Sequence, residues 1–122
     1  MNRPTPRAIA CLMLVEAASL AVASSLHLAG LVHGRAKPFD STDAGIAEAI
    51  IGVVLAAAGW SMLRRPATAR AVGLAATAFA ILGFGVGLSI TVPSGHLPDI
   101  AYHVTVLPLL VAGFVVLWRV RA

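Results

Sequence analysis

The sequence predicts an all-α fold, a four-helix transmembrane bundle that forms a single domain over residues 1–122. Three observations predict it. The chain is 59% apolar and only 11% charged, whereas soluble domains carry about 25% charged residues. Its mean hydropathy is +0.91. Four apolar stretches each approach the roughly 20 residues with which a helix crosses the hydrocarbon core. Because a soluble chain this short would need charge to cover its surface, lipid is the expected solvent.

The four apolar stretches are expected to be helices, because an open sheet edge in lipid would leave backbone groups unpaired. The short connections between them favour antiparallel packing of sequential helices. The predicted helices cover residues of about 8–32, 44–63, 69–92 and 100–118.

Helix-breaking and capping residues separate these stretches in the required order. Pro6 precedes the first helix. The run Asp40–Asp43 is typical of a helix N-cap and can begin the second helix. Pro66 can begin the third helix, and Pro93 is expected to end it, because a proline interrupts the helical hydrogen bonds. Pro98 can begin the fourth.

The basic residues predict the orientation, because they collect on the cytoplasmic side of membrane proteins. The first connection holds Arg35 and Lys37, and the third holds none. The other seven stand at the termini or in the second connection, which places both termini in the cytoplasm and the first and third connections outside. These seven are Arg3, Arg7, Arg64, Arg65, Arg70, Arg119 and Arg121.

The first stretch has an alternative interpretation as a secretory signal peptide. Ala21-Val22-Ala23 resembles a cleavage site that follows a short basic start and an apolar region. Against this, Glu16 interrupts the region, and the stretch stays apolar through Val32. Cleavage would leave three spans and remove Glu16.

Two carboxyl groups fall within predicted helices, where a charge is costly and a partner is expected. Glu16 lies roughly 13 Å along the helix from Arg7, near the midplane. Glu48 lies one turn into the second helix. Glu16 and His27 are separated by three full helical turns, so they share one face. Either carboxyl could be a buried hydrogen-bonding group or part of a proton-handling or ligand-binding site.

The histidines all fall in the predicted outer half, together with several acidic residues. Imidazole and carboxylate suit divalent metal ions, and His27 with His103 could form a bis-histidine haem site. The sequence has no HxxxH pair, no CxxCH and only one cysteine, Cys11, so we assign no metal ligands. The predicted ligand-binding residues are Glu16, His27, Glu48 and His103. The remaining polar residues of the outer half are His33, His96, Asp40, Asp43 and Asp99.

Two segments carry a family resemblance. AGIAEAIIGVVLAAAGW and RPATARAVGLAATAFAILGFGVGL resemble the DoxX-like group of small four-helix membrane proteins. The likeness rests on a Gly-x-x-Glu pattern from Gly45 to Glu48, a Gly-x-x-Leu pattern from Gly52 to Leu55, and the basic-proline turn at 64–66. The group includes subunits of quinone-linked sulfur oxidation, so the resemblance implies a small accessory or redox-associated subunit.

The predicted function is therefore the binding of a quinone-like or other apolar ligand in the outer half of the bundle. His27, Glu48 and His103 would supply polar contacts, and Glu16 a deeper one. One alternative is a small transporter or proton-coupled carrier, which would need self-association because four helices enclose only a narrow pathway. Another alternative is a membrane haem or metal-binding protein.

The expected surroundings follow from the same features. The net charge of +4 comes from residues at helix ends, so the partners are the lipid bilayer and a membrane protein or second copy, not nucleic acid. The excess of Arg over Lys, with much Ala, suggests a bacterial genome rich in GC. The expected location is the bacterial inner (plasma) membrane, as a multi-pass protein.

Overall fold

A computed structural model describes residues 4–31 and 40–120 and confirms the all-α prediction. No strand occurs within these two ranges. The four helices are each long and apolar enough to cross a membrane, so the chain has the make-up of an integral membrane protein with four spans. They are α1 (Pro4–Leu28), α2 (Ser41–Arg64), α3 (Ala69–Ser94) and α4 (Leu97–Arg119), with a 3₁₀ turn, η1 (Pro66–Thr68), before α3.

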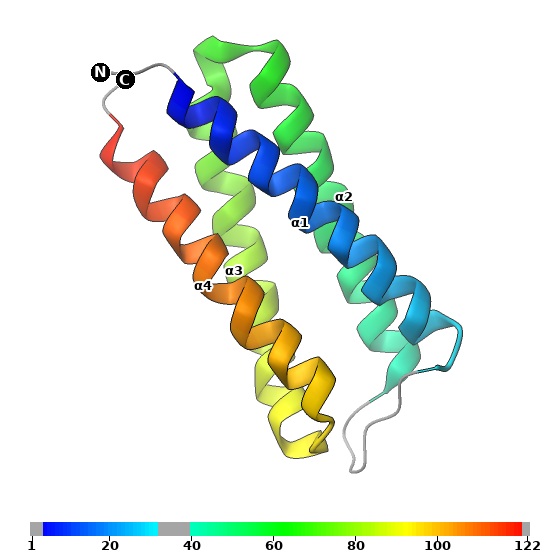
Figure 1. Cartoon of the computed structure of the whole chain (residues 1–122). Coiled ribbons are helices and arrows are strands. Elements are labelled where there is room, and N and C mark those ends of the chain that lie inside the picture. The colour runs from blue at the N-terminus through cyan, green and yellow to red at the C-terminus, as the bar shows by residue number, and fades with distance from the viewer. Residues whose placement is uncertain (1–3, 32–39, 121–122) are drawn as a thin grey trace.

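The helices run up and down in one bundle (Figure 1). α1 packs mainly along α2, α3 packs along α4, and the contact of α2 with α3 joins the two pairs. The end of the bundle where α1 and α3 end and α2 and α4 begin is called the predicted outer end. The arginines of the described ranges all lie at or near the opposite helix ends. They are Arg7, Arg64, Arg65, Arg70 and Arg119.

The helix ends follow the capping signals with two exceptions, Pro6 and Pro93. α1 begins before Pro6, which lies in its first turn. The Asp40 side chain accepts a hydrogen bond from the Asp43 backbone N–H (3.0 Å), as predicted for the start of α2. Pro93 does not end α3, which continues to Ser94. A proline in the final turn removes only one intrahelical hydrogen bond, so the helix tolerates it there. Gly95 caps α3 with a φ of +70°, a left-handed conformation that favours glycine.

Arg70 closes the opposite end of the bundle. Its Nε donates to the carbonyl oxygen of Leu117 and its Nη2 to that of Trp118, both at 3.1 Å. Carbonyl groups in the last turn of a helix lack intrahelical donors, and a cation there also opposes the negative end of the helix dipole. Arg70 therefore ties the start of α3 to the end of α4.

Small residues bring α1 and α2 together. Gly52 and Gly59 are buried on the face of α2 that also carries Glu48 and Leu55. A Cβ added at Gly59 would lie 3.0 Å from the Ala10 carbonyl oxygen, so a larger residue there must push the two helices apart. Close approach at small residues is a main source of helix association in lipid, where hydrophobic burial contributes little.

This packing predicts a difference between two glycine substitutions. Gly59→Leu should destabilise the bundle by about 1–3 kcal/mol through overpacking. Gly85→Leu is the matched control, because a Cβ added at Gly85 meets no atom within 4 Å. The measurement is thermal unfolding of the purified variants in detergent. Equal melting temperatures for the two variants would contradict close contact of α1 with α2 at Gly59.

Candidate functional site

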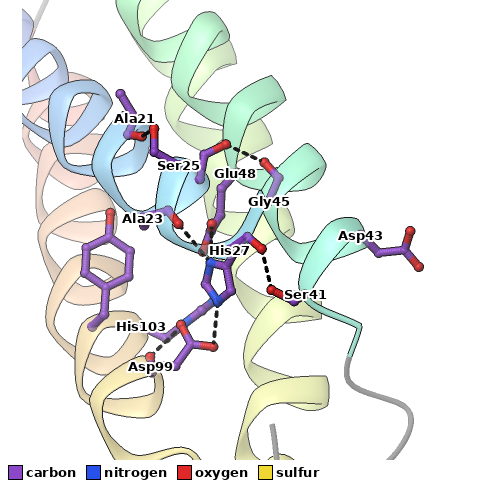
Figure 2. Close-up of polar contacts among 12 residues, drawn as sticks. Ala21, Ala23, Ser25, His27, Ser41, Asp43, Gly45, Glu48, Asp99 and His103 are labelled. Carbon is purple, nitrogen blue, oxygen red and sulfur yellow. Dashed lines mark hydrogen bonds and ion pairs between the residues drawn. The ribbon is translucent and has the colours of Figure 1, made fainter. Parts of the chain in front are cut away.

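Four polar side chains from three helices meet inside the predicted outer end. His27 comes from α1, Glu48 from α2, and Asp99 and His103 from α4; we call them the outer cluster. Each residue is between 3% and 7% exposed, so the cluster is shielded from both lipid and water. Figure 2 shows His27 projecting between Glu48 and Asp99.

His27 is the centre of the cluster. Its Nδ1 lies 2.7 Å from Glu48 Oε2 and 3.0 Å from the carbonyl oxygen of Ala23. Because a carbonyl oxygen only accepts, Nδ1 carries a hydrogen. Nε2, on the other side of the ring, lies 3.5 Å from Asp99 Oδ2. A protonated His27 therefore forms an ion pair with carboxylates of two other helices.

His103 completes the cluster beside Asp99. Its Nδ1 donates to the Asp99 backbone oxygen (2.8 Å), and it also lies 3.6 Å from Asp99 Oδ1. This fixes the ring with Nε2 on the side of α3, where a Cβ added at Gly87 would lie 2.9 Å from Nε2. The Phe84 ring packs against the imidazole, with centroids 5.2 Å apart. His103 is thus held by its own helix and by α3.

Two hydrogen bonds and a glycine hold α1 and α2 in the register that brings His27 to Glu48. The Ser24 hydroxyl donates to the Gly45 carbonyl oxygen (2.7 Å), and the Ser41 hydroxyl donates to the His27 carbonyl oxygen (Figure 2). A Cβ on Gly45 would lie 2.7 Å from Leu28 Cγ, so a side chain there would separate the helices. Glu48 stands on the same face of α2, one turn further on.

A pocket of about 580 Å³ leads from the lipid-facing surface to the cluster, between α2, α3 and α4. Its lining includes three residues of the cluster, Glu48, Asp99 and His103, and the exposed Asp40 and Asp43. Most of its remaining surface is apolar, and the rim includes residues exposed on the outside of the bundle. These rim residues are Ile50, Phe79, Leu82 and Val86.

The structure separates Glu16 from the other predicted ligand residues. Glu16 is buried on the same face of α1 as His27, but three turns away, or about 16 Å along the axis. It does not line the pocket. Its Oε1 is buried and makes no hydrogen bond to protein within the described residues. Three of the four predicted residues therefore meet, and Glu16 lies apart.

Tyr102 of α4 contacts residues of α1 and α3. Its hydroxyl lies 2.7 Å from the Ser19 hydroxyl of α1, and its ring centroid lies 6.1 Å from that of Phe84. Tyr102 is only half-buried. It therefore links α1 to α4 below the outer cluster.

The other two histidines differ from those of the cluster. His96 caps α4, since its Nδ1 accepts from the Asp99 backbone N–H at 3.3 Å. His33 lies outside the described residues, as do Arg35 and Lys37. Asp99 was grouped with the other polar residues of the outer half and was not selected as a ligand residue. Its spacing of four residues from His103 puts it on the same helical face, which is the signal that could have identified it.

The cluster geometry argues against the bis-histidine haem alternative. His27 and His103 both approach the Asp99 carboxylate, at 3.5 and 3.6 Å. Axial haem ligands instead face each other across the macrocycle. A haem held by these two imidazoles would have to displace the Asp99 side chain from both.

No family model, curated protein or solved structure matches this chain. The DoxX-like resemblance therefore remains a prediction. The chemistry of the site depends on its own residues, which are two carboxylates and two imidazoles beside a mostly apolar pocket.

The central position of His27 predicts a specific pattern of stabilities. His27→Ala should cost about 3–5 kcal/mol, because it leaves Glu48 and Asp99 buried without their shared partner. Adding Glu48→Gln to that variant should restore part of the loss, since it removes one of the two buried charges. Unfolding of the single and double variants in detergent measures the coupling.

Ser25→Ala is the control for this cycle, because Ser25 is exposed on α1 and bonds only to the Ala21 carbonyl of its own helix. It should unfold like the unaltered chain. Strictly additive losses for His27→Ala and Glu48→Gln would contradict a direct interaction.

Proposed function

We propose that this chain binds a quinone-like ligand, an apolar molecule with a hydrogen-bonding head group, in the pocket between α2, α3 and α4. The observation that supports this function is the pocket's lining, which is mostly apolar and includes Glu48, Asp99 and His103 of the cluster, together with the exposed Asp40 and Asp43. Its volume of about 580 Å³ lies in the range of small-molecule sites, roughly 300–1,000 Å³.

The cluster residues in the lining offer both kinds of hydrogen bond that such a head group needs. Glu48 Oε1 is buried and makes no hydrogen bond to protein within the described residues, so it can accept from a hydroxyl group. His103 Nε2 lies beside Gly87, and both residues line the pocket. Because Nδ1 carries a hydrogen, Nε2 accepts from a hydroxyl group in the neutral ring and donates to a carbonyl group in the imidazolium. A quinone presents carbonyl oxygens, and its reduced form presents hydroxyl groups.

The rim of the pocket allows entry from the bilayer. Leu82 and Val86 of α3 are 71% and 63% exposed, and both line the pocket. Since this surface of the bundle faces lipid, an apolar ligand could reach Glu48 without crossing water. His27 lies behind Glu48 and outside the lining, so its role is to position that carboxylate.

The same proposal includes the setting of the protein. We place it in a bacterial inner (plasma) membrane, with both termini in the cytoplasm, as a DoxX-like accessory or redox-associated subunit. Support comes from the arginines at one end of the bundle, which match the positive-inside rule, and from the segments that resemble that group. We assign no catalytic residue.

Titration with decylubiquinone tests the proposal. It should raise the melting temperature of the purified chain in detergent, and the shift should be lost in Glu48→Gln and in His103→Ala. Both variants remove a polar contact in the pocket. The control is Glu16→Gln, which alters a buried carboxyl outside the pocket and should keep the shift. An unchanged shift in both pocket variants would defeat the proposal.

Two glycines of α3 provide a second, independent test. Gly87→Ala places a methyl group 2.9 Å from His103 Nε2, so it should displace the imidazole and weaken quinone binding several-fold. Gly85→Ala, two residues away and outside the lining, meets no atom within 4 Å and should bind as before. Fluorescence quenching by the quinone measures both affinities. Equal affinities would place the ligand elsewhere.

A further inference from the structure

We propose that His27, Glu48 and Asp99 form a binding site for one divalent transition-metal ion. Each residue can supply one ligand atom, and these atoms lie within 4.8 Å of one another. Ligand atoms around one zinc-like ion, each at about 2.0–2.2 Å, lie within about 4.4 Å of one another. Small movements of three side chains would therefore close the cluster around an ion.

The charge of the cluster favours a divalent cation. Glu48 and Asp99 place two carboxylates in a buried site, where unpaired charges are strongly disfavoured. The described Lys and Arg side chains all belong to the opposite half of the bundle. One divalent ion would neutralise both carboxylates.

The buried oxygen atoms of the two carboxylates supply a second observation. Glu48 Oε1 is buried and makes no hydrogen bond within the described residues, although a buried carboxylate normally has one on each oxygen. Asp99 Oδ2 approaches His27 Nε2 only at 3.5 Å, beyond the usual range for a hydrogen bond. Glu48 and Asp99 each contribute one carboxylate oxygen to the set that would surround the proposed ion.

The orientation of the His27 ring suits a metal ligand. The Ala23 carbonyl oxygen accepts from Nδ1 at 3.0 Å, so Nε2, on the side of Asp99, is the nitrogen that would bind the ion. A hydrogen bond from one ring nitrogen to a backbone carbonyl commonly fixes a metal-binding histidine in this way.

The donor set defines the class of metal. One imidazole nitrogen and two carboxylate oxygens, with no thiolate, suit Zn²⁺, Mn²⁺ or Fe²⁺ and disfavour Cu⁺. Three protein ligands leave a coordination position open, as in metal sites that exchange ligands. Glu48 and Asp99 also line the pocket, so that open position could accept an oxygen of a pocket ligand. The ion can bind whether or not the chain binds a quinone.

Titration with Co²⁺ tests the site, because the visible absorption of bound cobalt reports protein ligands directly. The full chain, without a histidine tag and freed of metal by a chelator, should bind one Co²⁺ saturably and show ligand-field bands. Glu48→Gln and Asp99→Asn should each weaken binding at least about 10-fold, since even indirect metal contacts are worth that much. Zn²⁺ should displace the cobalt and remove the bands.

Two variants serve as matched controls. Glu16→Gln changes a buried carboxyl three turns from the cluster, and Asp43→Asn changes an exposed one whose side chain points away from it (Figure 2). Both should bind cobalt like the unaltered chain. Absence of saturable binding by the unaltered chain overturns the proposal, even where a variant fails to fold. Undiminished binding by Glu48→Gln also overturns it.

The outcome can be separated from that of the quinone proposal. Decylubiquinone is titrated into the metal-free chain, and Co²⁺ is titrated without quinone. A quinone shift without cobalt binding overturns the metal site and leaves the ligand pocket standing. Cobalt binding without a quinone shift supports the metal site and counts against the ligand.

Discussion

The arrangement of the predicted outer end depends on the His27 imidazole lying between Glu48 and Asp99. The three side chains come from three different helices, at 2.7 and 3.5 Å from the ring nitrogens. All three side chains are more than nine-tenths buried, so separating these helices would leave a buried carboxylate without its partner. We infer that the contact selects one register of α1, α2 and α4 among several that apolar packing alone would permit.

Close helix packing and the polar contacts have different effects on the fold. Packing brings the helices together, and the polar contacts fix their relative position along the axis. In lipid, the association of helices comes from van der Waals contact and hydrogen bonds. Gly45, Gly52 and Gly59 bring the backbone of α2 close to α1, but a row of small residues fits at more than one offset along the axis. The hydrogen bonds of Ser24 and Ser41 to backbone oxygens across the α1–α2 contact remove that freedom. Glu48 meets His27 at an offset that satisfies both hydroxyl groups.

The sequence predicted the features that depend on one helix alone. It did not predict which residues of different helices lie next to one another. The four spans and the Asp40 cap follow from composition and capping signals within a segment. Asp99 lies one turn before His103 on the same face of α4, but its contact with His27 depends on how α4 is rotated against α1. The neighbours of Tyr102 depend on the same rotation, which no pattern within α4 specifies. Glu16 was assigned the correct face of α1. Glu16 lies at a different level along the bundle axis from the outer cluster. Helical periodicity predicts which face a residue occupies, but not which residues of other helices lie at the same level.

A ligand in the pocket and a cation at the cluster would meet at the same two carboxylates, so each must change the affinity for the other. The direction follows from the chemistry of Glu48 and Asp99. As free carboxylates they accept hydrogen bonds, which favours a head group with hydroxyl donors. Bound to a cation they accept less well, and the open coordination position attracts a carbonyl oxygen instead. Occupation of the cluster by a metal ion would therefore shift the preference of the pocket from the reduced towards the oxidised form of a quinone-like ligand.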